Sequence, residues 1–503
     1  MRTKNVVKNF VTDFIPQILI MGLGIVKAKV LLDCLGESVL GLYQLFMQFV
    51  SYLAIAEGGL ASASLAKLYK PIAKEDNVKV KEILNATRNV FVIVGIIMLV
   101  LGLGISFLIP MFIENNIFEF SYIQFNFMLF LLSEVVTYFT LFSRIAFDAK
   151  QKKYKINLLI QGGTILKSLL EILILTMGGK ITSLFIMFIV LNTVINSIIV
   201  IKYRKEYSYL PKTKEKDYSL VKGVKHLLVH KIGGIIANNI DIVIISSTAG
   251  LGLAKVVVYS TYNYIITSLR IVIDKLYGAT TSSIGDLIVK EKEKSYKVFL
   301  EYNSLVNYIA AVLAVPLYFS IDYFINIWYE NKIGTSLAIS AMFVATFVYM
   351  TIRVPLLAYT TSAGLFKETK ICPIIESVIN LTLSLILVRI FGIPGILAAT
   401  LIALLISEYT IKPILLHKKI FNKNPIRYYT KNILLVLYIV VAMLIVTLLK
   451  SSIKIDNLFM WLVLSGVVFI TNMLVTTIYY IVIKEASFLN RVKEMFKRKG
   501  VKV

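Results

Sequence analysis

Apolar residues in this chain are gathered into blocks of about 20, separated by short polar connections. A helix of that length crosses the hydrocarbon core of a bilayer, which is about 30 Å thick, because each residue adds about 1.5 Å. Residues 91–110 and 433–449 are two clear examples. None of the blocks has the alternation of apolar and polar residues that a membrane-crossing strand requires. The sequence therefore predicts an all-α polytopic membrane protein.

We predict about 14 spanning helices, an even number that places both termini on the same side of the membrane. The loops are about 20 residues long at most, too short for a soluble domain of about 50 residues or more. The predicted spans are residues 10–32, 38–66, 89–113, 121–147, 156–178, 181–201, 226–248, 253–285, 298–320, 335–362, 371–391, 393–411, 433–449 and 458–483.

The longest internal polar stretch, residues 202–225, divides the spans into six and eight. The second and eighth spans each follow a glycine-containing turn and carry a tyrosine, which indicates an internal repeat of the kind common in transporters. The predicted organisation is an N-terminal lobe (1–201), a cytoplasmic linker (202–225), a C-terminal lobe (226–411), two extra helices (433–483) and a basic cytoplasmic tail (484–503).

The net charge of +25 would suggest nucleic acid as a partner of a soluble chain. Here the Lys and Arg residues crowd into alternate connections between the apolar blocks, and the other connections are nearly free of them. This is the positive-inside pattern of a membrane protein. It places both termini in the cytoplasm and removes nucleic acid as an expected partner.

Enzyme signatures are largely absent from the sequence, and no cofactor is expected. No phosphate-binding loop, dinucleotide turn or nucleophile elbow occurs. His226 and His230 are spaced to share one helical face, but no third metal ligand is adjacent in sequence, so an interfacial role is favoured over metal binding. Cys34 and Cys372 fall at opposite ends of the predicted spans, which argues against a disulfide.

Ionisable residues inside the spans are the informative ones, because each is costly if it faces lipid. Lys167 lies about 11 residues into its span, near the predicted midplane, and Glu171 is one helical turn away and can pair with it. The pair can be structural, or Lys167 can be a cation in a water-filled cavity. Lys27 and Lys29 point to opposite sides of the first span, so at most one of them faces a lumen.

Two further basic groups lie inside predicted spans of the C-terminal half. Arg270 and Asp274 form a turn-spaced pair, which can equally well sit near the cytoplasmic interface. Arg353 lies two residues before Pro355, and proline can kink a helix by removing a backbone hydrogen bond. A functional and a structural role are both open for these groups.

Acidic and amide side chains form a second set of candidates. Asn238, Asn239 and Asp241 make a polar stripe inside the seventh span, where amides can also hydrogen-bond between helices. Three glutamates lie nearer the ends of their spans, where interfacial roles are favoured over proton carriage: Glu57, Glu376 and Glu408.

Several motifs resemble those of the lipid-linked oligosaccharide flippases in the multidrug/oligosaccharidyl-lipid/polysaccharide exporter superfamily. The resemblance covers nearly the whole chain, and each motif is degenerate. The motifs are AIAEGGLASA at 54–63 with LYKP at 68–71, NNIDIVIIS at 238–246 with Gly250 and Tyr259, and IESVINL at 375–381 running into FGIPGI at 391–396 and Ala399 and Thr400.

The resemblance implies two pseudo-symmetric six-helix lobes around a central cavity lined by the first, second, seventh and eighth helices. It implies O-antigen or capsule repeat units linked to undecaprenyl pyrophosphate as substrate, moved from the inner to the outer leaflet of the bacterial plasma membrane by alternating access. Expected partners are this lipid-linked oligosaccharide, membrane lipids, and the polysaccharide polymerase and glycosyltransferases of the same biosynthesis.

An anionic pyrophosphate crossing a low-dielectric region needs cationic partners. The substrate-binding candidates are Lys167, Arg270, Arg353 and Lys27; the ion-coupling or polar cavity candidates are Asp241, Asn238, Asn239, Glu57 and Asp274. The coupling ion and the use of membrane potential stay open.

Three other classes of protein compete with a flippase. A multidrug or cation antiporter of the same superfamily typically has twelve helices and uses carboxylates for cationic drugs. A polysaccharide polymerase or membrane glycosyltransferase usually needs a sizeable outer loop, and the longest predicted one is 320–334. A scaffold has no need for charges at the midplane.

Overall fold

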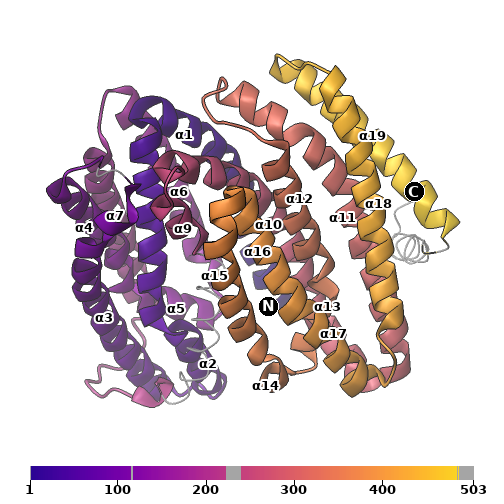
Figure 1. The fold of residues 1–503 in the computed structure, drawn as a ribbon. Helices are drawn as coiled ribbons and strands as arrows, with labels where there is room; N and C mark the ends of the chain where they lie inside the picture. The colour runs from indigo at the N-terminus through magenta and orange to yellow at the C-terminus, as the bar shows by residue number, and fades with distance from the viewer. Residues whose placement is uncertain (1, 115–116, 222–239, 484, 486–503) are drawn as a thin grey trace. The chain divides into compact units, whose positions relative to one another are not determined.

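The computed structural model describes residues 2–114, 117–221, 240–483 and 485. All regular structure in these ranges is helical (Figure 1). The predicted all-α class is therefore confirmed.

Ten helices in the described ranges are long and apolar enough to cross a membrane, judged by length and composition. They correspond to the predicted spans other than the first, second, seventh and eighth. The first span and the beginning of the second fall on one long, bent helix, and the eighth falls on a long helix from residue 252 to 290. Most of the seventh lies outside the described residues. The ten are Asn77–Phe112, Phe120–Ala149, Tyr154–Thr176, Ile181–Glu206, Lys294–Trp328, Leu337–Ser362, Ile371–Phe391, Ile393–Phe421, Ile426–Ser452 and Leu458–Val482.

The chain folds as two compact units, Met1–Val257 and Val258–Val503. The first contains α1 (Arg2–Leu53), η1 (Ala54–Glu57), α2 (Leu60–Ala73), α3 (Asn77–Leu108), η2 (Ile109–Phe112), α4 (Phe120–Tyr138), α5 (Leu141–Ala149), α6 (Tyr154–Thr176), α7 (Ile181–Glu206), η4 (Tyr218–Leu220) and α9 (Asp241–Ser247). Within it, α1 packs along α6, and α4 packs along α7 and α3.

The predicted glycine turn between the first two spans is present, but the second span is not one continuous helix. Gly36 has φ +77°, which favours glycine because it has no Cβ. The predicted span 38–66 is interrupted after Leu53 by η1 and by two left-handed glycines, Gly58 and Gly59. The sequence AIAEGG therefore ends one helix, and α2 starts anew beyond it.

The polar stretch after α7 is docked on the first unit. Asn85 Nδ2 donates to the Thr213 carbonyl over 2.8 Å, and Lys79 Nζ lies 3.1 Å from Asp217 Oδ2. The pKa of Asp217 lies below its usual value. The main cause is the hydrogen bond from the Ser219 N–H to its carboxylate, and the contact with Lys79 lowers it further. The first part of the predicted linker 202–225 therefore packs on the ends of the first unit's helices.

The second unit begins within α10 (Gly252–Lys290) and continues through α11 (Lys292–Trp328), α12 (Leu337–Ile352), α13 (Val354–Ser362), α14 (Phe366–Thr369), α15 (Ile371–Phe391), α16 (Ile393–Leu404), η5 (Leu405–Tyr409), α17 (Thr410–Leu416), η6 (His417–Phe421), α18 (Ile426–Ser452) and α19 (Leu458–Val482). The two C-terminal helices, α18 and α19, both pack on α11 (Figure 1).

Two features of the second unit bear on the predicted spans. The helix breaks at Arg353, between α12 and α13, and Pro355 lies at the start of α13. A break here is expected, because proline has no backbone N–H to continue the helical hydrogen bonds. By contrast, α11 continues to Trp328, so the predicted outer loop 320–334 was placed too early, and the connection to α12 is residues 329–336.

Candidate functional site

Two ion pairs join the helices of the first unit. Lys27 on α1 lies 3.3 Å from Glu171 Oε2 on α6, and the Glu171 side chain is only 1% exposed. Lys167 Nζ, also on α6, lies 3.8 Å from Glu134 Oε1 on α4 and 3.7 Å from the centre of the Phe188 ring on α7. The ring face adds a cation–π contact to the ion pair.

The predicted pairing of Lys167 with Glu171 is wrong. The two residues share a helical face, but each finds its acidic or basic partner on a neighbouring helix. Packing of α1 along α6 brings Lys27 to Glu171, and this is a tertiary contact that spacing within one helix does not predict.

A tighter network lies in the second unit, where the helix is irregular. Arg353, at the break between α12 and α13, lies 2.9 Å from Glu408, and Lys412 pairs with the other oxygen of the same carboxylate. The side chains of Arg353, Glu408 and Lys412 are 18%, 8% and 11% exposed. Glu408 sits in the π-helical segment η5, a geometry that often marks functional sites.

Two of the glutamates for which interfacial roles are predicted are buried in protein. Glu408 is buried and shared between two cations, and Glu376 on α15 is also buried, at 8% exposed. Lys412 was not a sequence candidate, although its place four residues after Glu408 was a usable signal.

Arg270 and Asp274 form the predicted turn-spaced pair on α10. The closest approach is 3.8 Å, and their side chains are 27% and 57% exposed. This is a loose pair whose acidic member is accessible, in contrast to the Arg353 network.

The structure describes some of the acidic and amide candidates and not others. Asp241 is the first residue of α9 and is 6% exposed, whereas Glu57 ends η1 and is half-buried. Asn238 and Asn239 lie outside the described residues, as do His226 and His230. Within the described ranges, no group of three or more His, Cys, Asp or Glu side chains is arranged to hold a metal ion.

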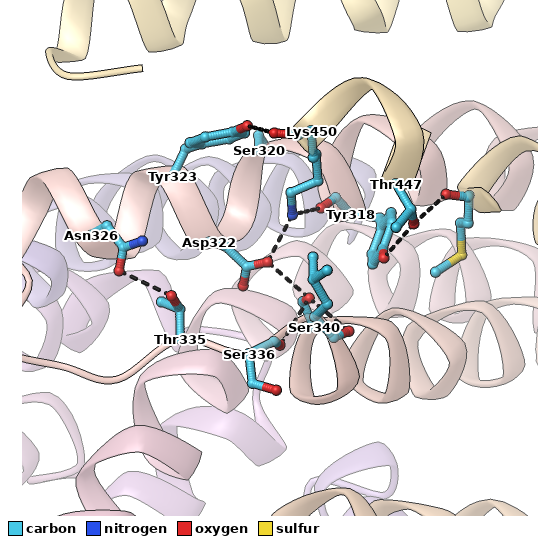
Figure 2. Close-up of polar contacts among 12 residues, drawn as sticks. Tyr318, Ser320, Asp322, Tyr323, Asn326, Thr335, Ser336, Ser340, Thr447 and Lys450 are labelled. Atoms are coloured by element: carbon cyan, nitrogen blue, oxygen red, sulfur yellow. Dashed lines mark hydrogen bonds and ion pairs between the residues drawn. The ribbon is translucent and has the colours of Figure 1, made fainter. Parts of the chain in front are cut away.

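A buried ion pair that was not a sequence candidate links four helices of the second unit. Figure 2 shows Lys450 of α18 pointing at Asp322 of α11, with Nζ and Oδ2 separated by 2.7 Å. Asp322 also accepts from Tyr262 on α10 over 2.6 Å and from Ser340 on α12 over 3.0 Å. Lys450 donates to the Tyr318 carbonyl over 3.1 Å.

All four candidate cations therefore have an acidic partner. The Arg353 pair is short and belongs to a buried three-residue network, which indicates a structural role. The pairs of Lys167 and Arg270 are at 3.8 Å, and their partners Glu134 and Asp274 are 38% and 57% exposed. These are the two longest of the four pairs, and their acidic partners are the most exposed.

No protein-family model matches the sequence, and no curated protein matches it. Solved structures do share its architecture. The lipid II flippase MurJ, in an inward closed conformation, matches with a TM-score of 0.62 and 16% identity, covering 93% of this chain and 98% of that chain. The chain has the fold of the multidrug/oligosaccharidyl-lipid/polysaccharide exporter (MOP) superfamily.

Multidrug transporters of the same superfamily also match. An inward-facing MATE family transporter has a TM-score of 0.61 at 16% identity, covering 82% of this chain and 99% of its own. A MATE structure in complex with MaL6 has a TM-score of 0.59 at 14% identity, covering 83% and 96%. These neighbours and the ten apolar helices identify a multi-pass membrane protein with the MOP fold.

Proposed function

We propose that this protein flips an oligosaccharide linked to undecaprenyl pyrophosphate from the inner to the outer leaflet of the bacterial plasma membrane by alternating access, for polysaccharide biosynthesis. The observation that carries the proposal is the fold match to a lipid II flippase over 93% of this chain. Both termini are proposed to be cytoplasmic, and the polymerase and glycosyltransferases of the pathway are proposed partners.

Two cations that are paired but accessible support an anionic headgroup. Lys167 and Arg270 are 21% and 27% exposed, and each has an acidic partner 3.8 Å away. A pyrophosphate carries more charge than a single carboxylate, so it can displace Glu134 or Asp274 from these cations. We propose that Lys167 is a pyrophosphate-contacting group of the first unit, and that Arg270 is one of the second unit.

An apolar groove in the second unit supports an amphiphilic substrate. It has a volume of about 380 Å³ and lies between α12, α16 and α18, with Val348, Leu401, Val436 and Val440 among its lining. Such a surface suits a long hydrocarbon chain, because burial of apolar area is favourable and non-directional.

A multidrug antiporter is the second candidate, because MATE transporters share the fold. The flippase match covers a larger share of this chain, 93% against 82% and 83% for these two. A polymerase is disfavoured by the short connection 329–336, since this class usually uses a large outer loop for sugar chemistry.

Replacing Lys167 or Arg270 with Gln is expected to lower flipping of a lipid-linked oligosaccharide by about tenfold or more per folded molecule. A hydrogen bond to a charged group contributes about 1.5–3 kcal/mol, and that contribution is lost. Flipping is measured in vesicles as access of an outer reagent to the labelled headgroup, at equal protein content.

Lys180→Gln, which removes an exposed lysine, is the matched control and should transport normally. Wild-type rates in both K167Q and R270Q would refute the proposed contacts. Export of a cationic dye by vesicles that do not flip the lipid would instead favour the antiporter.

We also propose that Asp241 takes part in ion coupling, because it is a buried carboxylate at the first turn of α9. In Asp241→Asn, transport should lose its dependence on a sodium or proton gradient, since the amide cannot bind either ion by charge. The control Asp456→Asn removes an exposed carboxylate and should keep the wild-type dependence. Unchanged gradient dependence in D241N would end this assignment.

A further inference from the structure

A small cavity that contains several polar side chains lies at one end of the C-terminal helices of the second unit. It has a volume of about 190 Å³ and is bounded by α11, α18, the end of α19 and the residue Glu485 that follows α19. Its polar lining comes from Ser304, Asn307, Arg427, Thr430, Lys431 and Glu485. The positive-inside pattern predicts that this end faces the cytoplasm.

The cavity carries an excess of positive charge. Arg427 and Lys431 line it from the first turns of α18, where the helix dipole also favours an anion, and Glu485 is the only acidic side chain among the described lining residues. Glu485 pairs with Lys431, and its Oε2 lies 2.9 Å from Ser304 Oγ, which is itself 3.1 Å from Lys431 Nζ. A single carboxylate thus occupies an arrangement of donors that suits a larger anion.

A buried hydrogen-bond acceptor and an apolar border indicate which other groups the ligand carries besides its anion. Asn307 is 1% exposed, and its Oδ1 has no hydrogen-bond partner among the described residues, so it can accept from a hydroxyl or ammonium group. On its other side the cavity is bounded by Leu434 and Ile483, which are 46% and 38% exposed. Leu434 continues into an exposed apolar face of α18, where Leu437 is 56% exposed, and α19 also carries exposed apolar side chains such as Ile478, at 61%.

We infer that this cavity binds the headgroup of an anionic membrane glycerophospholipid. Arg427 and Lys431 bind the phosphate, the Ser304 hydroxyl that contacts Glu485 donates to it instead, and Asn307 accepts from the polar group beyond the phosphate. The acyl chains lie along the exposed apolar faces of α18 and α19. Glu485 is an internal competitor, because it occupies Lys431 and Ser304 when no lipid is bound.

The binding of phosphatidylglycerol to the full-length protein in detergent, followed by native mass spectrometry, tests the site. Arg427→Gln and Lys431→Gln should each weaken binding by about fivefold, the effect of one basic residue on an anionic lipid. Glu485→Gln should strengthen binding by a similar factor, since it removes the competitor and keeps the side-chain shape. Phosphatidylcholine, which has no hydrogen-bond donor for Asn307, should bind more weakly than phosphatidylglycerol.

Lys419→Gln is the matched control, because Lys419 is an exposed lysine of the same unit that pairs with Glu368 outside the cavity. R427Q keeps the test valid even where K431Q fails to fold, because Arg427 is exposed and no described residue pairs with it. Wild-type affinity in R427Q together with unchanged affinity in E485Q would overturn the site.

Competition with two other phosphate compounds tests whether the ligand is a membrane phospholipid, free phosphate or the transported substrate. Inorganic phosphate should not displace the lipid at millimolar concentration, because it gains nothing from the apolar faces; equal competition would overturn the lipid assignment. Undecaprenyl pyrophosphate should bind with the same affinity to R427Q and the wild type. If its binding fell in R427Q while that of phosphatidylglycerol did not, the cavity would belong to the transported substrate and the inference would be wrong.

Discussion

Glu408→Gln is expected to destabilise the protein strongly, with a loss of about 3–5 kcal/mol in the free energy of unfolding. Glu408 is the ion-pair partner of both Arg353 and Lys412, whose side chains are 18% and 11% exposed. The neutral amide leaves two buried cations without this counterion. The measurement is the thermal unfolding midpoint of purified protein in detergent, together with the folded yield.

Glu368→Gln is the matched control, because that carboxylate also pairs with a lysine, Lys419, but with side chains 29% and 45% exposed. An exposed pair contributes about 0–1 kcal/mol, so this variant should unfold close to the wild-type temperature. The double variant R353Q/E408Q should be more stable than E408Q alone, since one of the two uncompensated cations is removed. Equal midpoints for E408Q and E368Q would contradict the network.

This network changes the role expected for Arg353. A cation held in a tight buried pair contributes to helix packing around the break beside Pro355. If Arg353 left this pair to bind a substrate, Glu408 would keep only Lys412 as an ion-pair partner. Arg353→Gln is therefore expected to affect folded yield more than transport per folded molecule, the reverse of Lys167→Gln.

The helical class and the span positions were predictable because they depend on local composition. An apolar block of about 20 residues has one stable solution in a bilayer, in which its own backbone satisfies every hydrogen bond. The turn at Gly36 and the break beside Pro355 were also local, since each follows from the backbone freedom or the missing donor of one residue.

The partners of the buried charges were not predictable in the same way. Lys167 and Glu171 share a face of α6, but which residue each one meets depends on the packing of α1 and α4 against that face. Asp322 and Lys450 lie 128 residues apart, near the ends of two predicted spans, where charges ordinarily reach water. No periodicity in the sequence connects such residues.

The Asp322–Lys450 pair supplies the second large expected effect. Asp322→Asn should lower the free energy of unfolding by about 3–5 kcal/mol, because the Lys450 side chain, 7% exposed, loses its counterion. The Tyr318 carbonyl and the faces of Tyr318 and Tyr323 remain near Lys450, but they carry no full charge to balance the ammonium group (Figure 2). Because α10, α11, α12 and α18 meet at this carboxylate, α18 should become accessible to proteolysis at temperatures where the wild type resists it.

A charge-balanced variant distinguishes loss of the ion pair from loss of packing. In D322N/K450M both charges are gone. The amide oxygen can still accept from Tyr262, and the amide nitrogen, in the place of Oδ2, can donate to the Ser340 hydroxyl, so most of the stability lost in D322N should return. Lys454→Met, which removes an exposed lysine four residues further along the chain, should leave the unfolding midpoint unchanged. If D322N/K450M unfolded at a lower temperature than D322N, the uncompensated charge of Lys450 would not be the cause of the instability, and the pair would have to stabilise the four helices through packing and hydrogen bonding alone.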